Sequence, residues 1–543
     1  MSELHDLTLA QAAERIAARE LSPVEYAEAL IARAEALQPQ LFTFITPTFE
    51  QARKSAKIAA EEIANGNYRG PLHGVPFAVK DIYDTAGILT SGHSRTCIDR
   101  IPDRDSTCVA RLHDAGAILT GKLATHEFAH GGPSFDLPWP PARNPWNTAH
   151  FTGGSSSGSG AAAAAGIAPI TLGSDTGGSI RSPAGLCGVA GMKPTYGLVS
   201  RAGVLPNSFS YDHCGPLART AEDCALILNA IAGHDPSDPA SSPAPVGDLT
   251  DGIANGIKGL RIGVIRHFWE ADMRAHSDLG PAMEQAISVF KHLGATIDEI
   301  DLRPMQHYLD VKIITAESEL FSIHLPELRT RPEAFGQDFR GRALAACLFT
   351  SEDYVRASRC RRVITTEMER LYQRYDLMLT ANTSAAPRID KHDILSFWTS
   401  ASLTTPFDVT GGPALALPCG FTQDGLPLSL QLVGRPFDDA TVLRAGHAYE
   451  KETGYWTARP HLVAGDQPAA VNPQVWVPDT SSVEPDVRGH AEIAARSAGL
   501  ELPPEIMEEL VAVAPHALAM ARRLPRDHEQ YDEVSSVFLP VGR

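Results

Sequence analysis

The sequence has few cysteines, no long apolar run and a shortage of basic residues. Its eight cysteines in 543 residues include no C-x-x-C pair, which excludes a disulfide scaffold and a cysteine-based zinc site. No stretch approaches 18 uninterrupted apolar residues, and the N-terminus has neither the basic segment nor the apolar segment of a secretory signal. These absences predict a soluble, cytoplasmic protein with reduced thiols and no membrane partner.

Acidic residues outnumber basic ones, 65 to 47, so the formal net charge is −18. A protein that binds nucleic acid neutralises phosphates with basic side chains, so we expect no nucleic-acid partner. Only ten of the basic residues are lysines, and the position of each lysine is therefore informative.

Hydrophobic residues make up 43% of the chain and charged residues 21%, which is enough apolar material for a large core. Short apolar runs that predict strands alternate with helical patterns. This alternation predicts an α/β fold with a mixed, mostly parallel central sheet covered by helices. The main strands are expected at 74–79, 117–119, 170–172, 260–265, 295–300, 377–379, 414–418 and 426–433, and the main helices at 8–38, 274–293 and 438–452.

Two short motifs point to unrelated hydrolases. His126 and His130 form H-E-x-x-H, which binds zinc when it lies on a helix. Gly131-Gly132-Pro133 follows directly, so a loop or helix end is the simpler interpretation. Ser156 lies in G-x-S-x-G, but the residues before it are weak strand formers, whereas a nucleophile elbow needs a strand there.

Three separated segments form a more specific pattern. They are GVPFAVKD at 74–81, GGSSSGS at 153–159 and SDTGGSIRSPAGLCGVAGMKPT at 174–195. Together they resemble the amidase signature family, the Ser-cisSer-Lys hydrolases. Supporting segments at 213–220, 404–420 and 425–450 extend the resemblance over roughly residues 5 to 460. The resemblance implies that the protein is an amidase of this fold, and it accounts for H-E-x-x-H as part of the family's E-F-A segment, with no metal or other cofactor.

The resemblance implies that Lys80 is the base, Ser155 the bridging serine and Ser179 the nucleophile that forms an acyl-enzyme. A lysine acts as a base only when it is neutral, and its reference pKa is about 10.4. Burial would lower this value, because desolvation disfavours the ammonium. Asp175 and Arg181 flank the nucleophile loop and, by the same resemblance, hold its shape.

Gly177 and Gly178 leave room for a substrate beside Ser179. The successive backbone N–H groups of Thr176, Gly177, Gly178 and Ser179 form the expected oxyanion hole. The substrate-binding candidates lie in or near the E-F-A segment. They are Glu127, Phe128, His130, Phe135 and Trp139.

Residues 1–460 are expected to form the catalytic domain, 461–486 a Pro-rich linker and 487–543 a small helical extension. The extension weakly resembles the small helical subunit of carboxybiuret hydrolase, which would mean that a separate subunit has become fused here. A family-specific tail that packs on its own domain or on a dimer mate is equally open. The leading function is hydrolysis of a small neutral or urea-like amide by a homodimer. The alternatives are the glutaminase subunit of a tRNA-dependent amidotransferase and a zinc hydrolase that uses His126 and His130.

Overall fold

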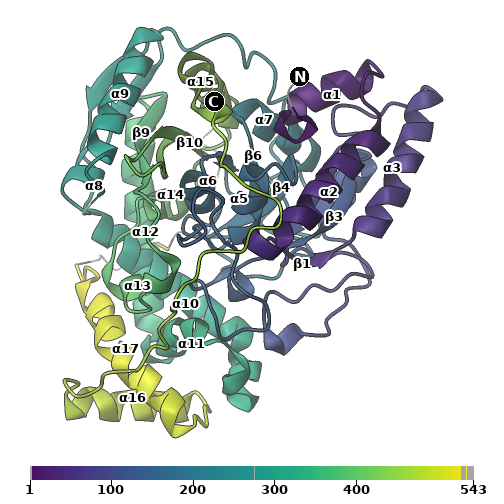
Figure 1. Ribbon diagram of the computed structural model, residues 1–543. Coiled ribbons are helices and arrows are strands. Elements are labelled where there is room, and N and C mark those ends of the chain that lie inside the picture. Colours follow the sequence, from purple (N-terminus) through teal and green to yellow (C-terminus); the bar gives the residue numbers. More distant parts are fainter. Residues whose placement is uncertain (1–2, 274, 528–532, 535–543) are drawn as a thin grey trace.

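The computed structural model describes residues 3–273, 275–527 and 533–534, and in these residues one 11-stranded sheet is surrounded by helices (Figure 1). The strand order is β1-β3-β2-β4-β6-β5-β10-β11-β9-β7-β8. The strands are β1 (Phe44–Pro47), β2 (Pro76–Lys80), β3 (Ile118–Leu123), β4 (Ile170–Asp175), β5 (Ala190–Lys193), β6 (His213–Ala218), β7 (Arg261–Val264), β8 (Thr296–Glu299), β9 (Leu377–Thr383), β10 (Ala414–Phe421) and β11 (Pro427–Gly434).

The sheet is mixed, as expected, but it is not mostly parallel. Within the described residues, only β2 with β3 and β4, and β7 with β8 and β9, pair in parallel, and the other six pairs are antiparallel. The reason is visible at β10 and β11, which are joined by a tight turn closed by Thr422 N and Leu426 O at 2.8 Å. Antiparallel neighbours accept such short turns, whereas parallel strands need a longer crossover.

The helices cover the sheet and extend beyond one end of it (Figure 1). None of those described is long and apolar enough to cross a lipid bilayer. They are α1 (Leu9–Ala17), α2 (Pro23–Leu41), α3 (Phe49–Ala64), α4 (Thr107–Asp114), α5 (Ser157–Ala164), α6 (Arg181–Cys187), α7 (Ala221–Ile231), α8 (His267–Glu270), α9 (Leu279–His292), α10 (Met305–Thr330), α11 (Gln337–Ala343), α12 (Ser351–Tyr372), α13 (Ser396–Thr399), α14 (Thr405–Val409), α15 (Asp439–Thr453), α16 (Pro485–Ser497) and α17 (Pro504–Arg523).

Local signals explain the start of α2 but not of α10. Ser22 caps α2 by accepting a hydrogen bond from Val24 N, and Pro23 occupies the first turn as its fixed φ favours. The long helix α10 has no such signal in the sequence. Its buried residues include Asp310, Lys312 and Glu317, and buried charges of this kind disrupt the apolar spacing by which an amphipathic helix is recognised.

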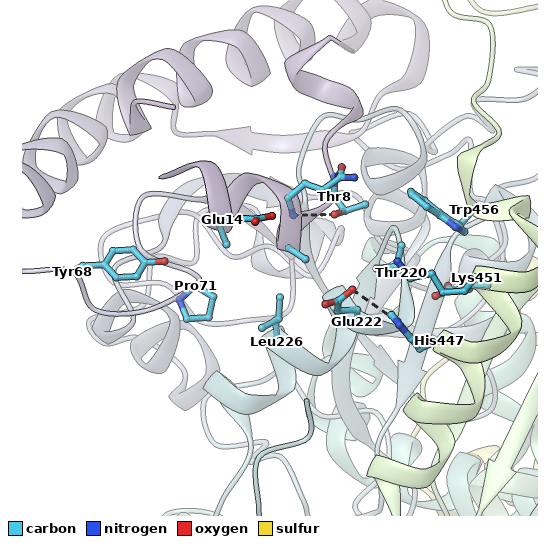
Figure 2. A pocket seen from close by; sticks show the side chains of 14 residues that line it. Thr8, Glu14, Tyr68, Pro71, Thr220, Glu222, Leu226, His447, Lys451 and Trp456 are labelled. Atoms are coloured by element: carbon cyan, nitrogen blue, oxygen red, sulfur yellow. Dashed lines mark hydrogen bonds and ion pairs between the residues drawn. The ribbon is translucent and has the colours of Figure 1, made fainter. Parts of the chain in front are cut away.

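A cavity of about 500 Å³ lies between α1, α7 and α15 (Figure 2). Its lining includes Glu14, Glu222 and His447, and His447 Nδ1 lies 3.8 Å from Glu222. No residue predicted for the active site is part of this lining.

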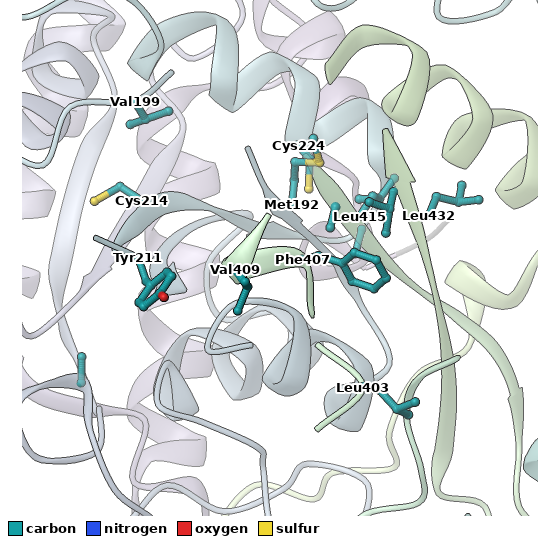
Figure 3. Close-up of a cluster of buried hydrophobic side chains, with 14 of the residues drawn as sticks. Met192, Val199, Tyr211, Cys214, Cys224, Leu403, Phe407, Val409, Leu415 and Leu432 are labelled. Carbon is teal, nitrogen blue, oxygen red and sulfur yellow. The ribbon is translucent and has the colours of Figure 1, made fainter. Parts of the chain in front are cut away.

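The main core cluster combines apolar side chains of β5, β6, β10 and β11 with side chains of α7 and α14. Figure 3 shows Met192 and Leu415 near Phe407 of α14, with Leu432 and Cys214 farther out in the same cluster. All five side chains are buried, so the centre of the sheet is a fixed support for the loops at its edge.

Helices α16 and α17 pack against α10, α11 and the short helical segment Leu344–Leu348 of the same chain. Two ion pairs fix this packing: Arg340 to Glu509 at 2.8 Å and Arg523 to Asp310 at 2.6 Å. Residues 461–484 before α16 contain no helix or strand. Residues 528–532 and 535–543 of the expected extension lie outside the described residues.

Substitution of Glu509 tests how much this packing contributes to stability. Both members of the pair are largely buried, at 12% and 5% side-chain exposure, so Glu509→Gln leaves an unpaired guanidinium. We expect a loss of about 1–3 kcal/mol in the free energy of unfolding, seen as a lower unfolding temperature. The control is Glu508→Gln, because the pair of Glu508 with Arg488 is exposed and its loss costs less than about 1 kcal/mol. Equal effects of the two variants would contradict this account.

Candidate active site

The site begins where two neighbouring parallel strands end. In β2 and β4, Val79 pairs with Leu172, so Lys80 and Ser174 lie at the same carboxyl edge of the sheet. The Lys80 ammonium donates to Ser174 Oγ at 2.9 Å. Parallel strands therefore bring a lysine and a serine hydroxyl together from positions 94 residues apart.

The first serine loop places Ser155 against the same lysine. Lys80 Nζ lies 2.7 Å from Ser155 Oγ, and the Gly154-Ser155 peptide bond is cis. His126 N donates to the Ser155 carbonyl at 3.0 Å and fixes the loop from the other side. A side chain at Gly154 would overlap the His126 ring, which explains why glycine stands before Ser155.

The loop that contains Ser179, the predicted nucleophile, follows β4 and ends at the start of α6. Ser179 is half-buried, and its carbonyl accepts a hydrogen bond from Ser156 N at 3.3 Å, which joins the two serine loops. Asp175 shapes the loop by accepting from Gly178 N at 2.6 Å and from Ile180 N at 3.1 Å. The Gly178 N–H is therefore engaged, whereas the N–H groups of Thr176, Gly177 and Ser179 donate to no described residue.

Arg181 lies at the centre of a fully buried charge cluster. Its guanidinium pairs with Asp175 at 3.0 Å and with Asp408 at 2.6 Å, and it also donates to Gln431 at 3.0 Å. Burial alone would raise the pKa of Asp175, but the adjacent Arg181 charge holds it well below its usual range. Burial and the neighbouring Asp175 raise the pKa of Asp408. The expected contact of Asp175 with Arg181 is present, and it fixes the nucleophile loop to β11 and α14.

The electrostatics of Lys80 favour the neutral amine. The side chain is fully buried, and desolvation lowers its pKa from 10.5 to about 7, against a smaller opposing effect of Asp175 and Asp212. Within the described part of the chain, no carboxylate lies within ion-pairing distance of Lys80 Nζ. The buried Lys122 differs, because Asp81 lies 3.4 Å from its ammonium.

The five substrate-binding candidates occupy different environments. Both carboxylate oxygens of Glu127 are engaged, by Ser94 Oγ at 2.5 Å and Gly336 N at 2.8 Å, and burial raises the pKa of Glu127 to about 8. Phe128 packs in the core, whereas Phe135 is partly exposed beside Arg143, and the carbonyl of Trp139 contacts His93. The fifth candidate, His130, contacts a carboxylate, because its Nε2 lies 3.1 Å from Glu317.

The H-E-x-x-H and G-x-S-x-G motifs do not adopt the conformations that a zinc site and a nucleophile elbow require. Residues Glu127–Ala129 form a single 3₁₀ turn, in which Phe128 has φ 49°, so His126 and His130 do not share a helix face. His126 Nδ1 contacts the Gly131 carbonyl at 2.7 Å. Searching the described residues finds no cluster of three metal-ligating side chains. Ser156 is buried with its hydroxyl bonded to the backbone of Ser174, and no strand precedes it.

Several residues of the site were not predicted from the sequence. Ser174 is the second hydroxyl on Lys80, Thr404 donates to the Gly177 carbonyl at 2.6 Å, and Asp408 completes the Arg181 cluster. Asp212 accepts from Thr176 Oγ1 at 2.6 Å. Thr404 and Asp408 fall in the segment 404–420, whose match to the family was the signal available for them.

Comparison with known proteins assigns the family. The Amidase family model matches residues 25–443. The chain therefore belongs to the Amidase family, and it is an enzyme that hydrolyses the C–N bond of amides. The match ends before α16 and α17, so these two helices lie outside the family model.

Individual relatives are covered over nearly their whole length. A glutamyl-tRNA(Gln) amidotransferase subunit of Chloroflexus aggregans is 40% identical over 489 residues, covering 85% of this chain and 99% of its own. The structure described as a vestigial protein complex that reveals the origins of an s-triazine catabolic enzyme has 33% identity and a TM-score of 0.77, covering 84% and 100%. The peptide amidase of Stenotrophomonas maltophilia has 30% identity and a TM-score of 0.74, covering 84% and 98%.

Gly178 provides a test of the loop geometry. Its φ is +131°, and a Cβ there would overlap Thr404 Oγ1, so Gly178→Ala must both strain the backbone and displace Thr404. We expect a loss of about 1–3 kcal/mol in stability and at least a tenfold loss of amidase activity. Gly425→Ala is the matched control, since Gly425 also has a positive φ, +78°, but open space around it. If both variants keep full activity, the loop does not depend on this close contact.

Proposed function

We propose that the chain hydrolyses amides through an acyl-enzyme on Ser179, with Ser155 as proton relay and Lys80 as base. The observation that carries this proposal is the 2.7 Å contact between Lys80 Nζ and Ser155 Oγ in a buried site without a paired carboxylate. A neutral lysine can accept a proton there, which a paired ammonium could not.

In the first step Ser179 Oγ attacks the amide carbon, its proton passes to Ser155, and Ser155 gives its own proton to Lys80. The C–N bond then breaks as Ser155 gives its proton to the leaving nitrogen and takes back the proton held by Lys80, so that ammonia or an amine departs and Lys80 is neutral again. Water repeats the sequence on the acyl-enzyme and releases the carboxylic acid. Without the proton from Ser155 the leaving group would be an amine anion.

The developing oxyanion needs donors that are free in the resting enzyme. Because Gly178 N is bonded to Asp175, our proposal reduces the four expected donors to Thr176, Gly177 and Ser179. Asp175 and Arg181 serve this hole indirectly, by holding the loop that presents it.

We further propose that residues 1–460 form the catalytic domain of a free-standing homodimer that has no nucleic-acid partner, with α16 and α17 as an appended unit. The alternative is a glutaminase subunit of an amidotransferase. It is supported by the similarity to the relative from Chloroflexus aggregans, which is named as an amidotransferase subunit. Glutamine turnover that requires a second protein, tRNA and ATP would favour that alternative, whereas amide turnover by the chain alone favours the free-standing enzyme.

Covalent labelling tests the proposed nucleophile. A neutral alkyl fluorophosphonate should form an adduct on Ser179, located by peptide mass mapping, because the proposed relay through Ser155 and Lys80 activates this serine. Lys80→Ala should reduce the labelling rate at least 100-fold, whereas Ser156→Ala, which removes a neighbouring buried hydroxyl, should leave Ser179 labelled. An adduct on Ser156, or loss of labelling only with a chelator, would refute the assignment.

The pH dependence of the same labelling tests the base. Only neutral Lys80 accepts the proton, and its pKa is about 7. The rate should therefore fall about tenfold per pH unit below 7 and level off above it. A midpoint near 10.5, the ordinary lysine value, would contradict a neutral Lys80 at pH 7, and a rate independent of pH between 5 and 8 would contradict its role as the base.

A further inference from the structure

A second lysine approaches the nucleophile loop from the opposite side. Lys312 lies on α10 and is only 7% exposed. A Cβ built on Gly177 would meet Lys312 Cε at 3.3 Å and Nζ at 3.7 Å. The ammonium is therefore beside the backbone that precedes Ser179, and it belongs to neither the Lys80 relay nor the Arg181 cluster.

The Lys312 ammonium has no polar partner, although the side chain is more than nine-tenths buried. Within residues 3–273, 275–527 and 533–534 it makes no hydrogen bond and no ion pair. Its neighbour is the ring of Phe397, whose centroid lies 5.7 Å from Nζ. Most of the side chain is buried, but Nζ is not among the fully buried atoms that lack a partner. The ammonium at its end is therefore able to bind an anionic group of a ligand.

Other charged groups lie near Lys312, and the Lys312 charge is one of those that lower the pKa of Glu317. Glu317 faces His130 at 3.1 Å, and Arg342 pairs with Asp338 at 2.9 Å while its guanidinium stacks 4.4 Å from the Phe397 ring. Unlike His130 and Arg342, Lys312 has no carboxylate within ion-pairing distance among the described residues.

The position of Lys312 is fixed from behind. Asp310 is two residues earlier on α10, which places it about 200° around the helix, on the opposite side. Arg523 of α17 holds Asp310 at 2.6 Å. With Asp310 facing α17, the turn of the helix directs Lys312 toward Gly177.

We propose that Lys312 binds a carboxylate of the substrate, so that this enzyme acts on amides that carry a negative charge close to the scissile bond. The one positive charge of an ammonium matches the one negative charge of a carboxylate, and its N–H groups can donate to the carboxylate oxygens. The proposal rests on the proposed acyl-enzyme function and replaces the neutral substrate expected from the sequence with an anionic one.

The test compares two probes of equal length, one alkyl fluorophosphonate with a terminal carboxylate and one with a terminal isopropyl group in its place. The readout is the ratio of their second-order rates of Ser179 labelling. We expect the wild-type chain to prefer the anionic probe about 10- to 100-fold, the range for a hydrogen bond to a charged group. Lys312→Met should abolish this preference while leaving the neutral rate within about threefold, and Lys312→Arg should retain part of it.

Lys291→Met is the matched control, because Lys291 is exposed on α9 and its loss changes the total charge equally. It should keep the preference, and unfolding temperatures will show that Lys312→Met is folded. A wild-type ratio near one, or an equal slowing of both probes in Lys312→Met, would overturn the carboxylate site while leaving the acyl-enzyme intact. No labelling of Ser179 by either probe would overturn the proposed function and this inference with it.

Discussion

The burial of the Lys80 amine against two hydroxyls is the constraint on which the rest of the site depends. Three lysines are completely buried, and their partners differ. Lys122 has the Asp81 carboxylate, and Lys193 has the carbonyls of Pro194 and Gly412. Among the described residues, the hydrogen-bond partners of Lys80 are the hydroxyls of Ser155 and Ser174 alone. Hydroxyls can exchange protons with an amine but do not compensate a full positive charge, so desolvation decides the protonation state of Lys80.

This constraint explains why so much structure surrounds a few polar atoms. Lys80 is buried where the adjacent parallel strands β2 and β4 end. Ser155 reaches it because residue 154 is a glycine, since a larger side chain there would overlap His126. The buried cluster of Arg181 with Asp175 and Asp408 supports the loop that contains Ser179. It concentrates compensated charges behind the nucleophile loop, where they fix its shape and remain distant enough to leave Lys80 unpaired.

The sequence predicted the strands that carry the site, because short apolar runs and Gly-rich loops are local signals. It also led to Lys80, Ser155 and Ser179, but through resemblance, since one lysine after a strand is not specific by itself. Strand direction was predicted poorly because an apolar run has the same pattern in either orientation. Lys312 and Asp408 were missed because they reach the site from helices more than 100 residues away, and their meaning depends on tertiary contacts.

The proposed chemistry depends on the protonation state of Lys80, which an NMR titration measures directly. The chain would be labelled with ¹³C at the lysine ε-carbons, and Lys80→Ala would identify the Lys80 signal among the ten lysines. We expect that signal to titrate with a midpoint of about 7. A midpoint near 10.5 would mean that the resting amine is an ammonium at neutral pH, and that the base of this amidase must be sought elsewhere.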